Sequence, residues 1–222
     1  MSVGVSILMP IYNGIEFIEE SVNSIKKQKY SNWELIIGIN GHEENSNVFN
    51  IANKYSCNNI NVIDMYKIKG KGDALNEMIK YCNYDWVSIL DVDDIWLPNK
   101  LKNQIEYTKN YDVIGTKCRY FGDLNSTPNI PCGDITNFNF LSVNPIINSS
   151  CLLKKNIAFW NTNKGLDDYE LWLRLWTSGK KFYNVHTIEV LHRIHKQSAF
   201  NAQGNNKLVG ELIKKYSSKN KQ

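Results

Sequence analysis

The chain contains 222 residues, with 26 lysines and arginines against 22 aspartates and glutamates, which gives a formal net charge of +4. This length suffices for one well-buried core but is short for two full domains. The mild positive charge suits an anionic small ligand, whereas dedicated nucleic-acid binders are far more basic, so we expect no nucleic-acid partner.

The cysteines and the apolar segments indicate a compartment. The five cysteines are scattered, odd in number and without a Cys-x-x-Cys pair, which argues against a disulfide framework and for reduced thiols. The apolar run at residues 3–9 stops at Pro10, far short of a signal peptide, and no other segment could cross a bilayer. We therefore expect a cytoplasmic protein with no transmembrane segment and at most peripheral contact with a membrane.

The first half of the chain alternates apolar strands with helices. The strands are predicted at Val3–Met9, Trp33–Ile39, Asn61–Met65 and Trp86–Leu90. We expect Asn13 to cap the first helix, residues 48–55 to form a weaker second helix, and Asp73 to cap the third. This alternation indicates βαβ units and a mostly parallel sheet, which places its ligand beyond the carboxyl ends of the strands.

The second half is less regular. A helix is predicted after Pro98, strands at Val113–Tyr120 and Ile146–Leu153, a loop at residues 122–137, a helix at Asp168–Ser178, short strands around Phe182 and Val190, and a terminal helix near Leu208–Tyr216. No internal repeat and no long linker separates the two halves. The predicted fold class is therefore α/β, a single domain with a mostly parallel central sheet flanked by helices.

The sharpest local signal is the run Asp91-Val92-Asp93-Asp94 at the end of an apolar strand. Three crowded carboxylates repel one another, and a bound divalent cation such as Mg²⁺ or Mn²⁺ removes that cost. Because side chains alternate along an extended segment, Asp91 and Asp93 lie on one side, where one can hold metal and the other a sugar or ribose. The alternative is that Asp93 or Asp94 caps the following helix.

Two further clusters carry charge in the second half. Asp167 and Asp168 open a helix whose leucines and tryptophans form a broad apolar face, and the acids alone could equally compensate the helix dipole. The segment 192–195, His-Arg-Ile-His, contains a His-x-x-His pair without an apparent third zinc ligand. Its Arg193 could pair with a diphosphate, because a guanidinium matches phosphate oxygens bidentately.

The glycine-containing turns argue against two nucleotide chemistries. Residues 69–72, Lys-Gly-Lys-Gly, lack the spacing and the terminal Ser or Thr of a Walker loop, and no Gly-x-Gly-x-x-Gly turn follows the first strand. ATP and dinucleotide chemistry are thereby disfavoured. Tyr12, at the mouth of the first strand, could stack on a nucleobase or pack against the rim of the sheet.

Taken in this order, these segments resemble the family 2 glycosyltransferases with the GT-A fold. The resemblance spans roughly residues 3–200 and includes the Pro-Ile-Tyr-Asn opening, residues 33–37 and 72–76, the acid cluster, the Asp-Asp-Tyr-Glu-Leu-Trp helix and the turn at 193–195. It implies a catalytic domain at 1–204, with a nucleotide-sugar half (1–95) and an acceptor half (96–204), followed by a C-terminal helix and basic tail (205–222).

The resemblance also implies roles for individual residues. Asp168 would be the general base, and Asp93 with His195 would hold Mn²⁺ or Mg²⁺. Asp167 and Trp172 would lie on the acceptor side. The residues implied in binding the nucleotide sugar are Pro10, Tyr12, Asn13, Asn40, Lys69, Gly72, Asn76, Asp91, Val92 and Arg193.

The implied reaction is inverting transfer of a sugar from a nucleoside diphosphate donor, usually a UDP-sugar, to a hydroxyl of a glycan, lipid-linked or protein-linked acceptor. Two positions depart from the family pattern. Asn40 replaces the aspartate that usually reads uracil, and Asp167 replaces the usual glutamate. One alternative within enzymes is a sugar-1-phosphate nucleotidyltransferase, and an alternative from another class is a non-catalytic nucleotide-sugar or glycan-binding module.

Overall fold

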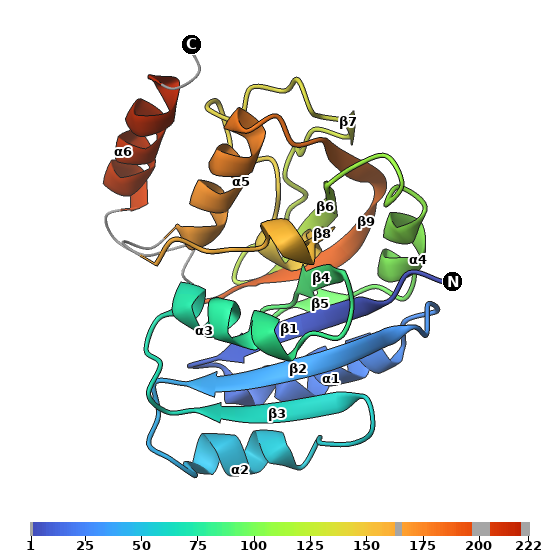
Figure 1. Cartoon of the computed structure of the whole chain (residues 1–222), viewed down its shortest axis with the longest axis vertical. Helices are drawn as coiled ribbons and strands as arrows, with labels where there is room; N and C mark the ends of the chain where they lie inside the picture. The colour runs from blue at the N-terminus through green and yellow to red at the C-terminus, as the bar shows by residue number, and fades with distance from the viewer. Residues whose placement is uncertain (1, 163–165, 197–204, 219–222) are drawn as a thin grey trace.

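The computed structural model describes residues 2–162, 166–196 and 205–218. Within these residues nine strands form one sheet, in the order β3-β2-β1-β4-β8-β6-β9-β5, and β7 pairs with β9 at its side (Figure 1). The strands are β1 (Val5–Ile11), β2 (Trp33–Asn40), β3 (Ile60–Met65), β4 (Trp86–Ile89), β5 (Ile95–Trp96), β6 (Val113–Gly122), β7 (Gly133–Asp134), β8 (Leu152–Lys154) and β9 (Phe182–Ile194).

Helices connect and cover these strands. The α-helices are α1 (Ile18–Lys26), α2 (Asn47–Asn53), α3 (Lys71–Met78), α4 (Lys100–Ile105), α5 (Asp167–Thr177) and α6 (Asn205–Ser217). Short 3-10 helices lie at η1 (Ile15–Phe17), η2 (Ile79–Tyr81), η3 (Asn148–Ser150) and η4 (Lys155–Ile157).

Strands β1 to β4 are parallel, as the alternation of strands and helices predicted. All residues of β1 are buried, because the sheet is covered on both faces and each face needs apolar side chains. Val5, Ile7 and Met9 face one core, and Leu8 between them faces the other. β1 runs through Pro10 to Ile11, beyond the predicted end. The proline is accommodated because pairing with β4 ends at Leu8, so a proline without an N–H leaves no gap in that ladder.

The two predicted helix caps are wrong. The first helical segment begins at Ile15 after Gly14, which has a φ of 87° and no side-chain cap, and α1 follows it. α3 begins at Lys71, so Asp73 lies inside the first turn of the helix rather than before it. An acid in that turn still complements the helix dipole.

The second half adds antiparallel strands to the parallel sheet. β8 pairs with both β4 and β6, and β9 then runs parallel to β6. The strand predicted at 146–153 is wrong in its first part, because residues 148–150 form the 3-10 turn η3 and only Leu152–Lys154 is strand. The two short strands predicted around Phe182 and Val190 are one strand, β9, whose pairing with β6 shifts register near Lys117 and then continues. The predicted loop at 122–137 contains the short strand β7.

Two cores lie on opposite faces of the sheet. One lies under α1, α2 and α4, and the other lies under α3, α5 and α6 (Figure 1). The result is the predicted α/β domain. Its proposed boundary at residue 204 lies outside the described residues. None of the helices that the structure describes is both long enough and apolar enough to cross a bilayer.

Candidate active site

A depression of about 300 Å³ opens where the carboxyl ends of β1 and β2 meet the turn after β4 and the end of β9. Parallel strands bring these ends to one edge of the sheet, although they are far apart in the sequence. The residues predicted to bind donor or metal that line it are Pro10, Tyr12, Asn13, Asn40, Lys69, Asp91, Val92, Asp93, Arg193 and His195. Gly14, Glu16, Lys71 and His192 also line it, and none of these four was singled out as a ligand-site residue.

An aromatic side chain stands at one side of the depression. Tyr12 is 55% exposed, and its ring lies over Gly41, where an added Cβ would come within 2.7 Å of it. Gly41 has a φ of 74°, so glycine suits both the turn and the close contact. Asn40 is buried, and its Nδ2 donates to the carbonyl of Lys69 at 3.4 Å. The exposed ring of Tyr12 can stack on a nucleobase, and the oriented amide of Asn40 can hydrogen-bond to its edge.

The carboxylate of Asp91 is held by side chains from two other segments. Lys71 Nζ lies 2.5 Å from Oδ1, and Asn148 Nδ2 lies 3.2 Å from Oδ2. The backbone N–H of Asp91 donates to Ser149 Oγ at 3.1 Å. Burial on its own raises the pKa of Asp91, but the Lys71 ammonium and the Asn148 amide outweigh it, and the pKa falls below its ordinary value. Asp91 is therefore an ionised, oriented acceptor.

Asp93 contacts the end of β9. Its Oδ2 lies 3.0 Å from Nε2 of His195. Burial, reinforced by the nearby carboxylates of Asp94 and Asp91, raises the pKa of Asp93. The side chain therefore carries a charge that its surroundings only partly compensate, and a cation would stabilise it.

Asp94 anchors the acid cluster to the sheet. It is fully buried and accepts hydrogen bonds from His192 Nδ1 and from the backbone N–H of Arg193, both at 2.9 Å. Burial lowers the pKa of His192, but the Asp94 carboxylate more than compensates and the net shift is upward. The capping alternative is wrong, because α4 begins after Asn99 and neither Asp93 nor Asp94 caps it.

Arg193 projects into the depression from β9. Its Nε donates to the carbonyl of Asp93 at 2.9 Å, and one terminal nitrogen lies 2.5 Å from Glu20 Oε2. The guanidinium carbon lies 4.4 Å from the ring centres of both Phe17 and Phe121. Two aromatic rings thus lie within cation–π distance of the guanidinium and stabilise its position in the depression.

Asp168 lies in the first turn of α5, next to the depression rather than among its lining residues. Burial raises its pKa, against the opposing charge of Lys71. Leu166, just before the helix, has a φ of 65°, a conformation that costs energy for a residue with a side chain and occurs at functional sites. Asp167 faces Gly72 in α3, where an added Cβ would lie 3.0 Å from Oδ2. Gly72 therefore lets the first turns of α3 and α5 approach each other.

The residues assigned to the donor or the acceptor that do not line the depression are Gly72, Asn76, Asp167 and Trp172. Trp172 is fully buried in the core, so the prediction that it faces an acceptor is wrong; it lies on the apolar face of α5. The amide of Asn76 is bonded in both directions to the backbone of Trp160, at 2.7 and 2.9 Å. Asn76 therefore fixes the segment leading to α5 and does not line the depression.

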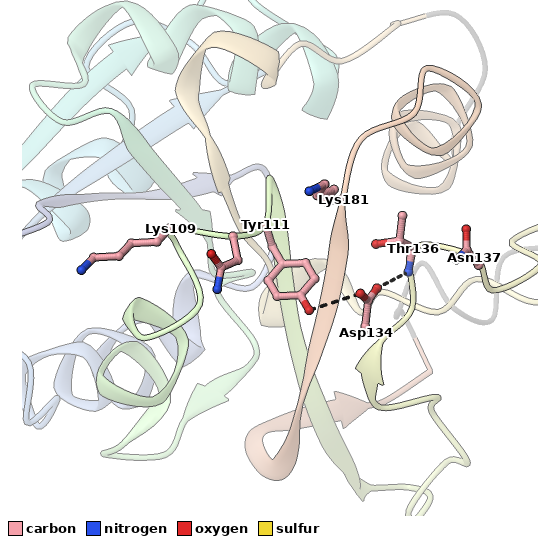
Figure 2. A pocket seen from close by; sticks show the side chains of 7 residues that line it. Lys109, Tyr111, Asp134, Thr136, Asn137 and Lys181 are labelled. Carbon is pink, nitrogen blue, oxygen red and sulfur yellow. Dashed lines mark hydrogen bonds between the residues drawn. The ribbon is translucent and has the colours of Figure 1, made fainter.

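A second depression, of about 420 Å³, lies at the opposite end of β6 and β9, where Tyr111 and Lys181 precede these strands (Figure 2). Tyr111 donates to Asp134 at 3.3 Å, and the same carboxylate accepts from the backbone N–H of Thr136 at 2.9 Å. Burial raises the pKa of Tyr111, and the Asp134 carboxylate adds to the shift. None of the predicted ligand-site residues lines this depression.

Comparison with known proteins identifies the family of the chain. Residues 6–158 match the sequence profile of glycosyl transferase family 2. The chain is 28% identical over 202 residues to UDP-Glc:alpha-D-GlcNAc-diphosphoundecaprenol beta-1,3-glucosyltransferase WfaP of Escherichia coli, with 87% of this chain and 78% of the relative covered. It is 38% identical over 101 residues to WfgD of the same organism, which has the same activity in its name; the match covers 46% of this chain and 39% of the relative.

Two solved structures share the fold. S. aureus TarS 1-349 in complex with UDP-GlcNAc superposes with a TM-score of 0.78 at 15% identity, over 98% of this chain and 66% of that one. The mannosyltransferase PcManGT from Pyrobaculum calidifontis, in complex with GDP-Man and Mn²⁺, gives a TM-score of 0.67 at 17% identity, over 87% and 58%. Both confirm the GT-A architecture, and with the sequence match they establish that the chain belongs to glycosyl transferase family 2, a family of sugar-transferring enzymes.

Proposed function

We propose that the chain is an inverting, metal-dependent glycosyltransferase that moves a sugar from a UDP-sugar to a hydroxyl group of a glycan acceptor. The observation that carries this proposal is the shared depression, in which Tyr12 and Asn40 stand with Asp91, Asp93 and Arg193 around a single volume of about 300 Å³. Such a site offers an aromatic face for a base, acids for hydroxyls and metal, and a cation for phosphate.

The donor would lie with its base near Tyr12 and Asn40. Because Asn40 Nδ2 points to the Lys69 carbonyl, its Oδ1 is the atom left to accept a hydrogen bond from a base. Uracil carries one such imide N–H. Asp91 would accept from the ribose or sugar hydroxyls, and Pro10, Asn13 and Val92 would shape the wall. The UDP-sugars named for WfaP and for the TarS complex support a uridine donor.

The acid cluster fits a divalent cation. Among the described residues, no three His, Cys, Asp or Glu side chains group closely enough to hold a metal by themselves. Asp93 and His195 offer two ligand atoms, and Mg²⁺ or Mn²⁺ usually completes its shell with water and substrate phosphates. When bound with the donor, such an ion would supply positive charge against the departing diphosphate.

Arg193 would add a second positive charge at the same place. Its guanidinium now pairs with Glu20, a side chain that is more than half exposed, and a diphosphate would take the place of that carboxylate. An exchange of one exposed anion for another costs little, whereas the two flanking rings keep the cation in position.

Asp168 would act as the general base. It would take the proton of the acceptor hydroxyl as the oxygen attacks the anomeric carbon from the face opposite the diphosphate. The new glycosidic bond forms as the bond to the diphosphate breaks, so one displacement inverts the configuration. The raised pKa of Asp168, caused by burial, makes it a stronger base than an exposed aspartate.

Family membership favours this reading over a sugar-1-phosphate nucleotidyltransferase or a non-catalytic binding module. The acceptor is proposed to be a glycan carried on a lipid, since WfaP and WfgD are named for a diphosphoundecaprenol-linked sugar. Such an acceptor would place the enzyme at the cytoplasmic surface of a membrane, in peripheral contact.

A donor panel tests the proposal. Incubation with UDP-glucose, UDP-N-acetylglucosamine and GDP-mannose in the presence of Mn²⁺ should show slow hydrolysis of one donor and a thermal shift with the same compound. If the folded protein neither hydrolyses nor binds any of them at millimolar concentration, the proposed function is wrong.

A further inference from the structure

Asn148 lies against the acid cluster without belonging to any of the segments that define it. Its Nδ2 is 3.3 Å from Oδ1 and 3.2 Å from Oδ2 of Asp91, 57 residues away in sequence. The amide must present its nitrogen here, because an amide oxygen facing a carboxylate would be repelled. Asn148 therefore contacts both oxygens of Asp91, whereas Lys71, which lines the depression, contacts one of them.

The turn that carries Asn148 is fixed from within the protein. Trp96 Nε1 donates to the carbonyl of Ser149 at 2.7 Å, and Gln104 Nε2 donates to the carbonyl of Ser150 at 2.8 Å. Ser149 Oγ accepts the backbone N–H of Asp91, so side chain and backbone of that aspartate are both tied to η3. A buried turn held this way has little freedom, and it transmits that rigidity to Asp91.

The other end of the Asn148 amide shows that stability alone does not explain the residue. Asn148 Oδ1 is buried and has no hydrogen-bond partner among the described residues. An unpaired buried acceptor lowers the stability of the fold, and such an atom in a native protein calls for an explanation. Of the two polar atoms of the amide, only Nδ2 makes hydrogen bonds, and both of them are to the Asp91 carboxylate.

We propose that Asn148 is a positioning residue of the donor site, which holds the Asp91 carboxylate in the orientation that receives the nucleotide sugar. The inference rests on the proposed function, and it assigns η3 as a further element of the donor site beside the strand ends. Asn148 acts through Asp91 and does not itself line the depression.

Substitution at 148 separates this role from a structural one. The probe is the donor that binds most tightly among UDP-glucose, UDP-N-acetylglucosamine and GDP-mannose, measured by calorimetry with Mn²⁺. Asn148→Ala should weaken donor binding by about tenfold, which is the loss expected for one hydrogen bond to a charged group. Losing the hydrogen bond to Asp91 lowers the stability of the fold and losing the unpaired Oδ1 raises it, so the melting temperature should change little. Asn148→Asp keeps the shape but sets a second carboxylate against Asp91, and should weaken binding further.

A double-mutant cycle identifies the residue through which Asn148 acts. In the Asp91→Asn background, adding Asn148→Ala should change donor binding by less than about twofold, because the contact is already altered. Asn144→Ala is the matched control, since it removes a hydrogen bond to Ile146 in the same segment without touching Asp91. It should bind donor as the unmodified chain does.

The outcomes distinguish the two levels of the proposal. Normal donor binding by Asn148→Ala, an undiminished loss in the Asp91→Asn background, or a loss accompanied by a large fall in melting temperature would each overturn the role of Asn148. If the unmodified chain binds none of the three donors, the proposed function itself is refuted and this inference with it.

Discussion

His195 Nε2 lies 3.0 Å from Asp93 Oδ2, although 102 residues separate them. The two side chains come from the turn after β4 and from the end of β9, so the contact joins the two halves of the sheet at the depression. Burial raises the pKa of Asp93, and the nearby carboxylates of Asp94 and Asp91 raise it further. A histidine beside it can neutralise it when protonated or share a metal with it when neutral.

The first prediction concerns this pair. Asp93→Ala and His195→Ala should each remove most of the effect of Mn²⁺ on donor binding, with about 100-fold weaker binding in the presence of the ion, because two protein ligands leave no substitute for either. Calorimetric titration of donor with and without Mn²⁺ measures this.

Asp134→Asn serves as the control, since this exposed aspartate belongs to the second depression. It should keep the full response to Mn²⁺. An Asp93→Ala variant that still gains affinity from the ion would show that the metal binds elsewhere.

The second prediction concerns the base. Tyr12→Ala should weaken donor binding by about 1–3 kcal/mol, the usual contribution of an aromatic side chain stacked on a nucleobase. Tyr12→Phe should retain nearly all of it, because the ring supplies the contact. Tyr81 is also an exposed tyrosine but does not line the depression, and Tyr81→Ala should bind normally. If Tyr12→Ala and the unmodified chain bind the donor with equal affinity, the base does not bind at the end of β1.

The strand ends of this site could be predicted from the sequence for a physical reason. Tyr12, Asn40 and Asp91 each follow an apolar run, and alternation with helices makes the runs parallel, so their ends share one edge of the sheet. This prediction needs only the order of strands and helices along the chain, and no knowledge of contacts between side chains. Arg193 was considered as a diphosphate partner from its own chemistry, but only the family resemblance placed Arg193 and His195 at this site, since nothing local to residues 192–195 says that β9 ends at the same edge.

The parts that could not be predicted depend on distant contacts. Asn148 lies in a segment whose apolar neighbours favour a strand, and its bond to Asp91 spans 57 residues. Lys71 was considered only as part of a turn that is not a Walker loop, yet it contacts the same carboxylate. Trp172 shows the converse error, because the helical pattern had already placed it on an apolar face and the resemblance moved it to the acceptor side.

The third prediction concerns a buried lysine behind the site. Lys100 is fully buried, its Nζ lies 3.0 Å from Ser88 Oγ and 2.9 Å from Gln104 Oε1, and burial lowers its pKa to about 7. Between that value and its ordinary value of 10.5, the unfolded chain binds a proton that the folded chain does not. The free energy of unfolding should therefore rise with pH over this interval, by up to about 1.4 kcal/mol per pH unit.

Lys100→Met removes the titrating group and should remove this part of the pH dependence. Urea unfolding at pH 7 and pH 9 measures it, with Lys102→Met on the exposed side of α4 as the control that keeps the rise. Identical slopes for the two variants would mean that Lys100 stays protonated in the folded chain.

The fourth prediction concerns the general base. Asp168→Asn keeps the size of the side chain but cannot take a proton, so kcat for transfer should fall by at least about 10²-fold while the donor binds nearly as before. Because burial raises the pKa of Asp168 above its ordinary value of 3.8, the rate of the unmodified enzyme should decline with acid at a higher pH than an exposed aspartate would give. The group is active when ionised, so activity is present above the raised pKa and is lost below it.

The neighbouring acid provides the control for Asp168. Asp167 faces the backbone of Gly72, and an asparagine there can still accept a hydrogen bond, so Asp167→Asn should change kcat only modestly. Removing a buried charge should also leave Asp168→Asn at least as stable as the unmodified chain at neutral pH, which thermal unfolding checks. Full transfer activity in a folded Asp168→Asn variant would assign proton removal to another group, and a large loss in Asp167→Asn with Asp168→Asn unaffected would identify Asp167 as that group.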